Sequence, residues 1–389
     1  MLYIHIPYCR KKCIYCDFFS GGAGLADWRR LRRALAAELA MRSSELPSAL
    51  HSIYFGGGTP SLLPPEEFDA LADELRSVIE NSGSRIAEDC EVTIEVNPED
   101  VDHEHIDAWK SGGVNRVSIG LQTFSDSMLK AIGRTHSGDR AERALKLLQE
   151  HFSNVSGDLI FGLPGQSVED LSGDVQRLTS LNPQHISVYS LMYEEGTALT
   201  ALRDAGRITA AAESIVADQY VALTDMLCEA GYEHYEISNY AKTGYRSRHN
   251  SGYWEGKRYL GIGPSAHSYD GRRPRRANPA DLHGYLNRFA PVGRDTVPEA
   301  PISSDEPFYI EEILSDEELR EERVMLGLRR CEGIDLIGFR KDFGEDALSK
   351  LLDSARLHIC NGSLMRAGEQ LHLTRSGVMI SDTVIVDLI

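Results

Sequence analysis

Six short apolar runs, rich in β-branched residues, recur along the first half of the chain with amphipathic helical stretches between them. Strands that alternate with helices favour βα units and a parallel sheet. Glycine-rich or Asn-Pro segments follow the runs, which suits a partial (β/α)6 TIM-like barrel with its chemistry at the carboxyl ends of the strands. The predicted strands cover residues 2–6, 52–55, 91–96, 116–120, 155–161 and 185–191, and the predicted helices cover 27–43, 65–81, 125–132, 140–151 and 168–181.

The alternation of strands and helices fades after about Tyr240. Towards the C-terminus the fold class changes from an α/β barrel to a smaller α+β module of winged-helix type. A cluster of prolines marks a linker. A further helix is predicted over residues 316–330. The prolines of the linker are Pro291, Pro298, Pro301 and Pro307. We therefore expect a barrel over residues 1–240, a basic extension over 241–298 and a C-terminal module over 299–389.

Three cysteines, Cys9, Cys13 and Cys16, lie on one loop directly after the first predicted strand. Thiolates at this Cys-x3-Cys-x2-Cys spacing can bind three irons of a [4Fe–4S] cubane. No fourth cysteine follows, so one iron stays open to a small molecule. Basic neighbours on the loop favour thiolates.

Three other interpretations of these cysteines remain open. A structural zinc site needs four ligands, and His5 would have to be the fourth. A disulfide framework is disfavoured because the chain has seven scattered cysteines and is not disulfide-dense. Unrelated buried thiols are the third possibility, although three on one basic loop are an unusual arrangement for them.

The composition limits the classes of partner. A net charge of −18 argues against general binding of nucleic acid or anionic membranes, since both need a basic face. No apolar run is long enough to span a bilayer, and Met1 leads straight into the first strand without a signal peptide. We therefore expect the reducing cytoplasm, where an iron–sulfur cluster and free thiols survive.

Polar side chains recur where the predicted strands end. Three glycines and Thr59 follow the second strand, and glycine allows a ligand to approach backbone N–H groups. Taken singly, each polar residue is more often a satisfied structural group. Together they suit a zwitterionic ligand with hydroxyls, because Arg binds carboxylates and acidic groups bind amines or ribose. The other residues of this set are Glu95, Gln122, Arg134 and Asp158.

The motifs YIHIPYC, GGGTP, EVNPE, GLQTF, DLIFGLPGQ and GIGPSAHS resemble, in order and spacing, the radical S-adenosylmethionine (SAM) proteins of the oxygen-independent coproporphyrinogen III oxidase family. The resemblance covers nearly the whole chain. It implies a [4Fe–4S] cluster on the three cysteines, with SAM bound to the open iron through its amino and carboxylate groups. The SAM pocket implied by the resemblance consists of Tyr3, Tyr15, Gly57, Gly58, Thr59, Glu95, Gln122, Arg134 and Asp158, with Met192 and His267 near further contact positions.

Two branches of this family differ at positions that can be compared with this sequence. The oxidase branch carries a further cysteine two residues after the third, where this chain has Phe18. It also has an N-terminal extension, whereas only eight residues precede Cys9. The heme-chaperone branch resembles this chain in CIYCDF and in the HNxxYW motif that begins at His249. The resemblance therefore favours the heme-chaperone branch.

The residue types of the HNxxYW motif are suited to binding heme. A neutral imidazole of His249 is a suitable axial ligand for heme iron, and Tyr253 and Trp254 offer flat faces to a porphyrin. The arginines of residues 242–276 could bind the two propionates. That segment has nine Lys or Arg against two acids, whereas residues 299–322 have ten acids against one Arg, so the two segments could instead pair with each other.

The sequence therefore predicts a heme chaperone that passes heme to client apo-hemoproteins, with the cluster, SAM and an electron donor regulating or driving transfer. Two alternatives stay open. One is an anaerobic coproporphyrinogen III oxidase, which would cleave SAM reductively and decarboxylate a porphyrinogen. The other is a member in which the cluster only stabilises the barrel.

Overall fold

A nine-stranded sheet forms the centre of the computed structural model, which describes residues 1–22, 27–292 and 307–389. Its strand order is β11-β1-β4-β5-β6-β7-β8-β10-β9. The six strands from β1 to β8 in this order are parallel to their neighbours, which confirms the predicted βα units. They are β1 (Leu2–Ile6), β4 (Ala49–Gly57), β5 (Arg85–Val96), β6 (Arg116–Gln122), β7 (Val155–Phe161) and β8 (His185–Ser190).

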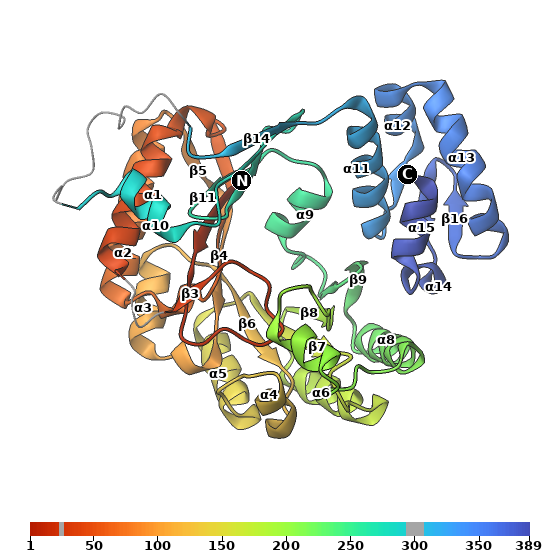
Figure 1. Cartoon of the computed structure of the whole chain (residues 1–389), viewed down its shortest axis with the longest axis horizontal. Helices are drawn as coiled ribbons and strands as arrows, with labels where there is room; N and C mark the ends of the chain where they lie inside the picture. The colour runs from red at the N-terminus through yellow and green to blue at the C-terminus, as the bar shows by residue number, and fades with distance from the viewer. Residues whose placement is uncertain (23–26, 293–306) are drawn as a thin grey trace.

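Helices cover the outer face of this curved sheet (Figure 1). Their apolar stripes, such as Leu35 of α1 and Leu71 of α2, pack with Phe55 of β4 in one hydrophobic core. Ser167 caps α6 with a capping box, whereas Ser125 makes no side-chain bond to the N-terminus of α4. The covering helices are α1 (Trp28–Met41), α2 (Pro65–Asn81), α3 (His103–Ser111), α5 (Gly138–His151), α6 (Val168–Leu181) and α8 (Glu213–Glu229), whereas α4 (Asp126–Ala131) and α7 (Ala198–Asp204) pack beside the loop that carries the cysteines.

The sheet extends beyond the six predicted strands at both edges. β11 (Leu260–Ile262) lies parallel to β1, and β10 (Asn239–Ala241) and β9 (Glu233–Glu236) continue antiparallel after β8. These strands have three or four residues each, too few for an alternating pattern to reveal them. The barrel sheet therefore includes a strand from the segment expected to be a basic extension.

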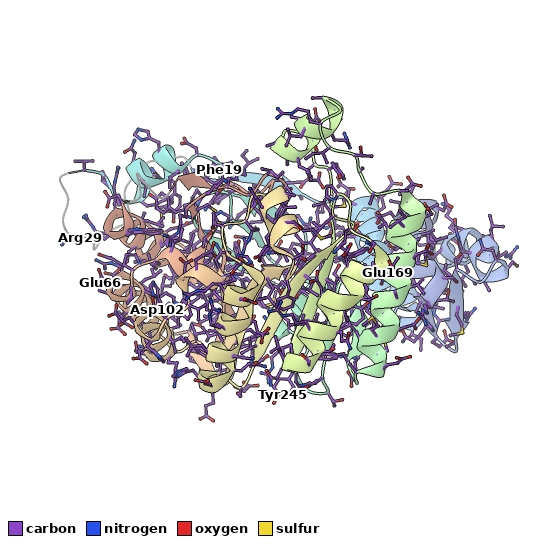
Figure 2. The ribbon with its side chains drawn as sticks, turned by 90° about the horizontal axis from the view of Figure 1, so that it is seen from below. Phe19, Arg29, Glu66, Asp102, Glu169 and Tyr245 are labelled. Atoms are coloured by element: carbon purple, nitrogen blue, oxygen red, sulfur yellow. The ribbon has the colours of Figure 1, made fainter. Side chains whose placement is uncertain are left out.

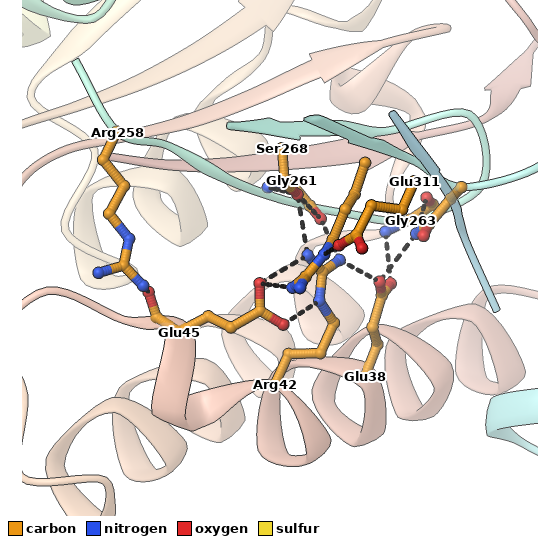
Figure 3. Close-up of polar contacts among 10 residues, drawn as sticks. Glu38, Arg42, Glu45, Arg258, Gly261, Gly263, Ser268 and Glu311 are labelled. Atoms are coloured by element: carbon orange, nitrogen blue, oxygen red, sulfur yellow. Dashed lines mark hydrogen bonds and ion pairs between the residues drawn. The ribbon is translucent and has the colours of Figure 1, made fainter. Parts of the chain in front are cut away.

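A buried ion network attaches that extension to the barrel (Figure 3). Glu38 of α1 is fully buried. Its carboxylate accepts hydrogen bonds from Arg42 (3.0 Å), Asn278 (2.8 Å) and the Gly263 N–H (2.8 Å). Arg42 donates in turn to the carbonyl of Gly261 at 3.0 Å. Charged groups on α1 thus reach the backbone on either side of β11.

The basic and acidic segments pair with each other through a small sheet. β12 (His267–Tyr269), β13 (Pro274–Ala277) and β14 (Ile310–Ile313) form an antiparallel three-stranded sheet. Ion pairs join Arg275 to Glu322 at 2.7 Å, Arg276 to Glu311 at 2.6 Å, and Arg273 to Asp316. The predicted pairing of the two segments is confirmed over the described residues. The predicted linker prolines Pro298 and Pro301, and the boundary between residues 298 and 299, lie outside them.

The C-terminal module has its own hydrophobic core, which includes Val324, Phe339 and Leu371. A three-stranded sheet in the order β15-β17-β16 packs with helices, in agreement with the predicted α+β module. The elements are α11 (Asp316–Arg329), β15 (Ile334–Asp335), α12 (Leu336–Phe343), α13 (Glu345–Cys360), β16 (Leu364–Ala367), β17 (Gln370–Leu373), α14 (Arg375–Val378) and α15 (Ser381–Leu388). Across all described residues, no helix combines the length and apolar character that crossing a bilayer requires.

Candidate functional site

The three cysteines lie on a loop whose ends are held together. β2 (Tyr8–Cys9) pairs with β3 (Gly21–Gly22), and residues 9–20, which include all three cysteines, form what we call the cysteine loop. The Gly21 N–H donates to the carbonyl of Pro7 at 2.6 Å. Phe19 of this loop and Tyr245 lie on opposite sides of the molecule in Figure 2. Because the loop follows β1, it lies at the carboxyl ends of the parallel strands, as predicted.

Two donors reach the cysteine sulfurs from other parts of the chain. The Thr59 hydroxyl donates to Cys9 Sγ at 3.3 Å, and the Arg134 guanidinium donates to Cys13 Sγ at 3.7 Å. Such bonds favour the thiolate. Burial raises the thiol pKa of Cys16 to about 11, and the neighbouring Lys12 opposes this shift in the predicted direction. Deprotonation there depends on the metal itself.

The glycine turn after β4 lies directly beneath the cysteine loop. Gly57 has a φ of +111°. A Cβ on Gly58 would lie 2.7 Å from the carbonyl oxygen of Tyr8, so only glycine permits this approach. The Gly58 N–H donates to the carbonyl of Ile6 at 2.8 Å. The Gly57 N–H instead faces Glu95, whose Oε2 lies 3.3 Å away.

Two carboxyl groups, from Glu95 on β5 and Asp158 on β7, lie inside the barrel. Tyr54 donates to Glu95 at 2.8 Å, and Ser118 donates to Asp158 at 2.9 Å. Burial raises the pKa of Glu95 from 4.5 to about 7 and also raises the pKa of Asp158. The buried cation Arg116 (1% exposed) opposes both shifts, and its Nε has no hydrogen-bond partner among the described residues.

Arg134 connects the cysteine loop with β6. Its guanidinium donates to the carbonyl of Gly120 and to Asn97 Oδ1, both at 2.8 Å. Its Nε is a buried donor without a described partner, as a carboxylate-binding arginine would provide. Gln122 ends β6 with a φ of +68°, and its amide nitrogen would lie 2.7 Å from a Cβ on Gly120. Gln122 and Arg134 therefore converge on one point of the rim.

Tyr3 lies on β1 with its ring beside that of Tyr54, and Tyr15 lies on the cysteine loop. The Tyr3 hydroxyl bonds His5 Nδ1 at 3.1 Å, and His5 Nε2 bonds the carbonyl of Phe19 at 3.0 Å. Both ring nitrogens of His5 are therefore engaged, so service as the fourth zinc ligand of the alternative interpretation requires one of these bonds to break. Burial and the neighbouring Cys13 raise the pKa of Tyr15. Of the two less certain contacts, Met192 is 60% exposed and His267 is also exposed on β12.

His249 lies inside the barrel, with its ring centroid 4.9 Å from that of Tyr54 and 6.5 Å from that of Tyr3. It belongs to α9 (Arg248–Trp254), is 1% exposed, and its backbone N–H donates to Glu91 near the middle of β5. Ser52 bonds Nδ1 at 2.9 Å and Tyr253 bonds Nε2 at 3.0 Å. Burial lowers the imidazole pKa to about 3, so the ring is neutral, as a heme ligand must be. Ligation of iron by Nε2 nevertheless requires Tyr253 to move away, and the role of His249 as a ligand stays a prediction.

The residues at the carboxyl ends of the strands fit an iron–sulfur cluster with SAM. Three thiols with donors to two sulfurs form the donor set, and a glycine cradle, two buried carboxyls and an unpartnered arginine Nε complete the pocket. No three His, Cys, Asp or Glu side chains among the described residues converge as one metal ion requires. In a cubane, by contrast, each thiolate binds a different iron.

Sequence reasoning missed several residues that organise this site. Asn97 bridges Thr59 (3.5 Å) and Arg134, and its place in the EVNPE motif was the available signal. Tyr54, which donates to Glu95, and Arg116, whose charge opposes the raised pKa of both carboxyls, carried no signal. Their side chains occupy the barrel interior only because β4, β5, β6 and β7, which helices separate in sequence, meet there.

Comparisons with known proteins agree with this geometry. Residues 3–178 match the Radical SAM superfamily and residues 314–380 match the HemN C-terminal domain. The chain is 33% identical to the heme chaperone HemW of Lactococcus lactis subsp. lactis (98% of this chain, 95% of the relative). It is 32% identical to HemW of Bacillus subtilis (98% and 97%). The Escherichia coli coproporphyrinogen III oxidase HemN, 20% identical, shares the fold with a TM-score of 0.82 over 100% of this chain and 89% of that one.

Proposed function

The chain belongs to the HemW family of radical SAM proteins, and from that premise we propose that it binds heme and transfers it to client apo-hemoproteins. The observation that carries the proposal is similarity to HemW proteins over nearly the full length of both chains. The presence of Phe18 in place of a fourth loop cysteine supports the same branch. The cluster and SAM regulate transfer, and an electron donor reduces the cluster.

The SAM half of the proposal assigns a role to each group at the rim. Cys9, Cys13 and Cys16 hold the cluster, which when bound leaves one iron open to the amino and carboxylate groups of SAM. We assign the SAM carboxylate to Arg134, whose buried Nε has no hydrogen-bond partner among the described residues. The remaining members of the set hold the amine, ribose and adenine. These are Tyr3, Tyr15, Gly57, Gly58, Thr59, Glu95, Gln122 and Asp158.

The pKa of Glu95 makes SAM binding depend on pH. A protonated carboxyl cannot accept a bond from an amine or hydroxyl as strongly as a carboxylate. Because burial raises this pKa to about 7, the binding form is lost as the pH falls through 7. SAM affinity of the reconstituted protein should rise about tenfold from about pH 6 to about pH 8. Equilibrium dialysis measures it, and Glu95→Gln should remove the rise; an unchanged pH profile in that variant contradicts the assignment.

Heme transfer is the direct test of the proposed function. Anaerobically reconstituted protein, loaded with hemin, is mixed with apomyoglobin as the heme acceptor. We expect transfer to accelerate when SAM and dithionite are added, because both act on the cluster site. The Soret band of the acceptor reports the rate, and protein without SAM is the control. Equal rates with and without SAM exclude regulation, and conversion of coproporphyrinogen III to protoporphyrinogen identifies the oxidase instead.

A further inference from the structure

A cavity of about 790 Å³ lies between the barrel extension and the C-terminal module. Its walls are the end of α9, the turn between β12 and β13, and the helices α11, α12 and α13. The volume falls within the range of about 300–1,000 Å³ for small-molecule sites, which often lie between domains. No residue of the cysteine loop lines it. The cavity is therefore separate from the SAM site.

Aromatic rings form much of the cavity wall. Tyr253, Trp254, Tyr259, Tyr269 and Phe343 all line it. Tyr253 and Tyr259 meet edge to face with centroids 4.7 Å apart. The buried Trp254 indole N–H has no hydrogen-bond partner among the described residues. Such walls favour a large flat ligand.

Cations exceed acids around the cavity by two charges. Arg272 has no ion pair with any described residue, and Arg330 reaches Glu332 at 3.3 Å and Glu255 only at 3.8 Å. Most of the others pair with acids of the opposite wall or of their own element. The cations are Lys257, Arg272, Arg273, Arg275, Arg320, Arg323 and Arg330, and the acids are Glu255, Asp316, Glu322, Asp335 and Asp342. Guanidinium groups bind carboxylates bidentately, so the excess matches a ligand with two carboxylates.

We infer that this cavity is the heme site, with the porphyrin ring against the aromatic wall and its two propionates on the arginines. The inference rests on the proposed function, which names heme as the cargo. It moves the cargo away from His249, whose ring is buried and engaged at both nitrogens. Arg272 on one wall and Arg320 of α11 on the other are the two arginines that can bind the propionates at the least cost in existing ion pairs. Arg272 has no ion pair with a described residue, and Arg320 has only a surface pair with Glu317.

His249 acts on this site through Tyr253. Its Nε2 holds the Tyr253 hydroxyl at 3.0 Å, and the Tyr253 ring lines the cavity. On its other side, His249 packs 4.9 Å from Tyr54, which donates to Glu95 of the SAM pocket. His249 is therefore a positioning residue that lies between the two sites.

Metal-free protoporphyrin IX tests the cavity without any axial ligand. Fluorescence titration should show binding to the wild-type protein. Arg272→Glu/Arg320→Glu should weaken it at least about tenfold, since charge-assisted bonds to both carboxylates are lost. Arg356→Glu, at a 78% exposed arginine outside the cavity, is the control with the same change of charge per site. Protoporphyrin IX dimethyl ester, whose carboxylates are blocked, should bind the wild-type protein as weakly as the double variant binds the free acid. Unchanged affinity in the double variant, or equal affinity for the ester, overturns the inference.

The role of His249 needs a separate comparison. His249→Ala and Tyr253→Phe should lower the affinity for protoporphyrin IX and for hemin alike, and His249→Gln, which can still bond the Tyr253 hydroxyl, should restore it. Loss of hemin binding alone in His249→Ala would show that His249 ligates the iron. If protoporphyrin IX binds in the cavity but hemin is not passed to apomyoglobin, the proposed function fails and the cavity assignment stands. If the Arg272→Glu/Arg320→Glu variant keeps normal affinity for protoporphyrin IX and still passes hemin to apomyoglobin, the cavity assignment fails and the proposed function stands.

Discussion

Replacing Cys9, Cys13 and Cys16 together by Ala should abolish the iron–sulfur cluster and, with it, SAM binding. A cubane needs three protein thiolates, and the remaining four cysteines, at 90, 228, 331 and 360, belong to other parts of the fold. After anaerobic reconstitution, iron and inorganic sulfide should fall from about four of each per chain to background. Equilibrium dialysis should then detect no SAM binding.

The matched control for this variant is Cys228→Ala/Cys331→Ala/Cys360→Ala, which removes three exposed cysteines. It should keep full iron and sulfide content. Circular dichroism should show native secondary structure for both triple variants, because the cysteine loop packs on the rim of the barrel and not in its core. Substantial iron and sulfide in the loop variant would mean that other residues hold the cluster.

Arg42→Met should give the largest loss of stability of any single substitution considered for this chain. The change leaves the buried Glu38 carboxylate without its cation and removes the bonds of Arg42 to Gly261 and Ser268. Breaking a buried ion pair on one side typically costs about 3–5 kcal/mol, a large share of the roughly 5–15 kcal/mol that stabilises a domain. Urea unfolding followed by circular dichroism measures the change.

Two further variants separate the buried charge from the lost side chain. Arg76→Met breaks an exposed pair with Asp73 and should cost no more than about 1 kcal/mol. Adding Glu38→Gln to Arg42→Met should recover part of the loss, since the unpaired charge is then absent. A loss below about 1 kcal/mol in Arg42→Met would show that solvent reaches Glu38.

Local pattern was enough to predict the barrel strands and the cysteine loop. Alternation and length revealed the six parallel strands β1, β4, β5, β6, β7 and β8, because each is long enough to bury a continuous apolar row. The three cysteines lie close to one another along the chain, and the glycine turn directly follows a predicted strand. Their chemistry is therefore local, and a sequence displays it.

Long-range pairing hid the short strands and the polar interior. β11 has three residues and joins β1 only because residues more than 250 positions apart meet there. Arg116 opens a strand that begins like any other, and nothing nearby in sequence tells that its charge will oppose the raised pKa of both Glu95 and Asp158. Such charge states depend on groups from several strands at once.

The HNxxYW motif shows the division between the two levels most clearly. The amino-acid sequence alone determined that an imidazole, two aromatic rings and a run of arginines lie close together along the chain. Only the tertiary structure decided that the imidazole points into the barrel while Tyr253 and three of the arginines (Arg272, Arg273 and Arg275) line a cavity closed by the C-terminal module. The physical reason is that burial and hydrogen-bond partners, which decide whether a ring nitrogen is free, come from strands and helices far away in sequence.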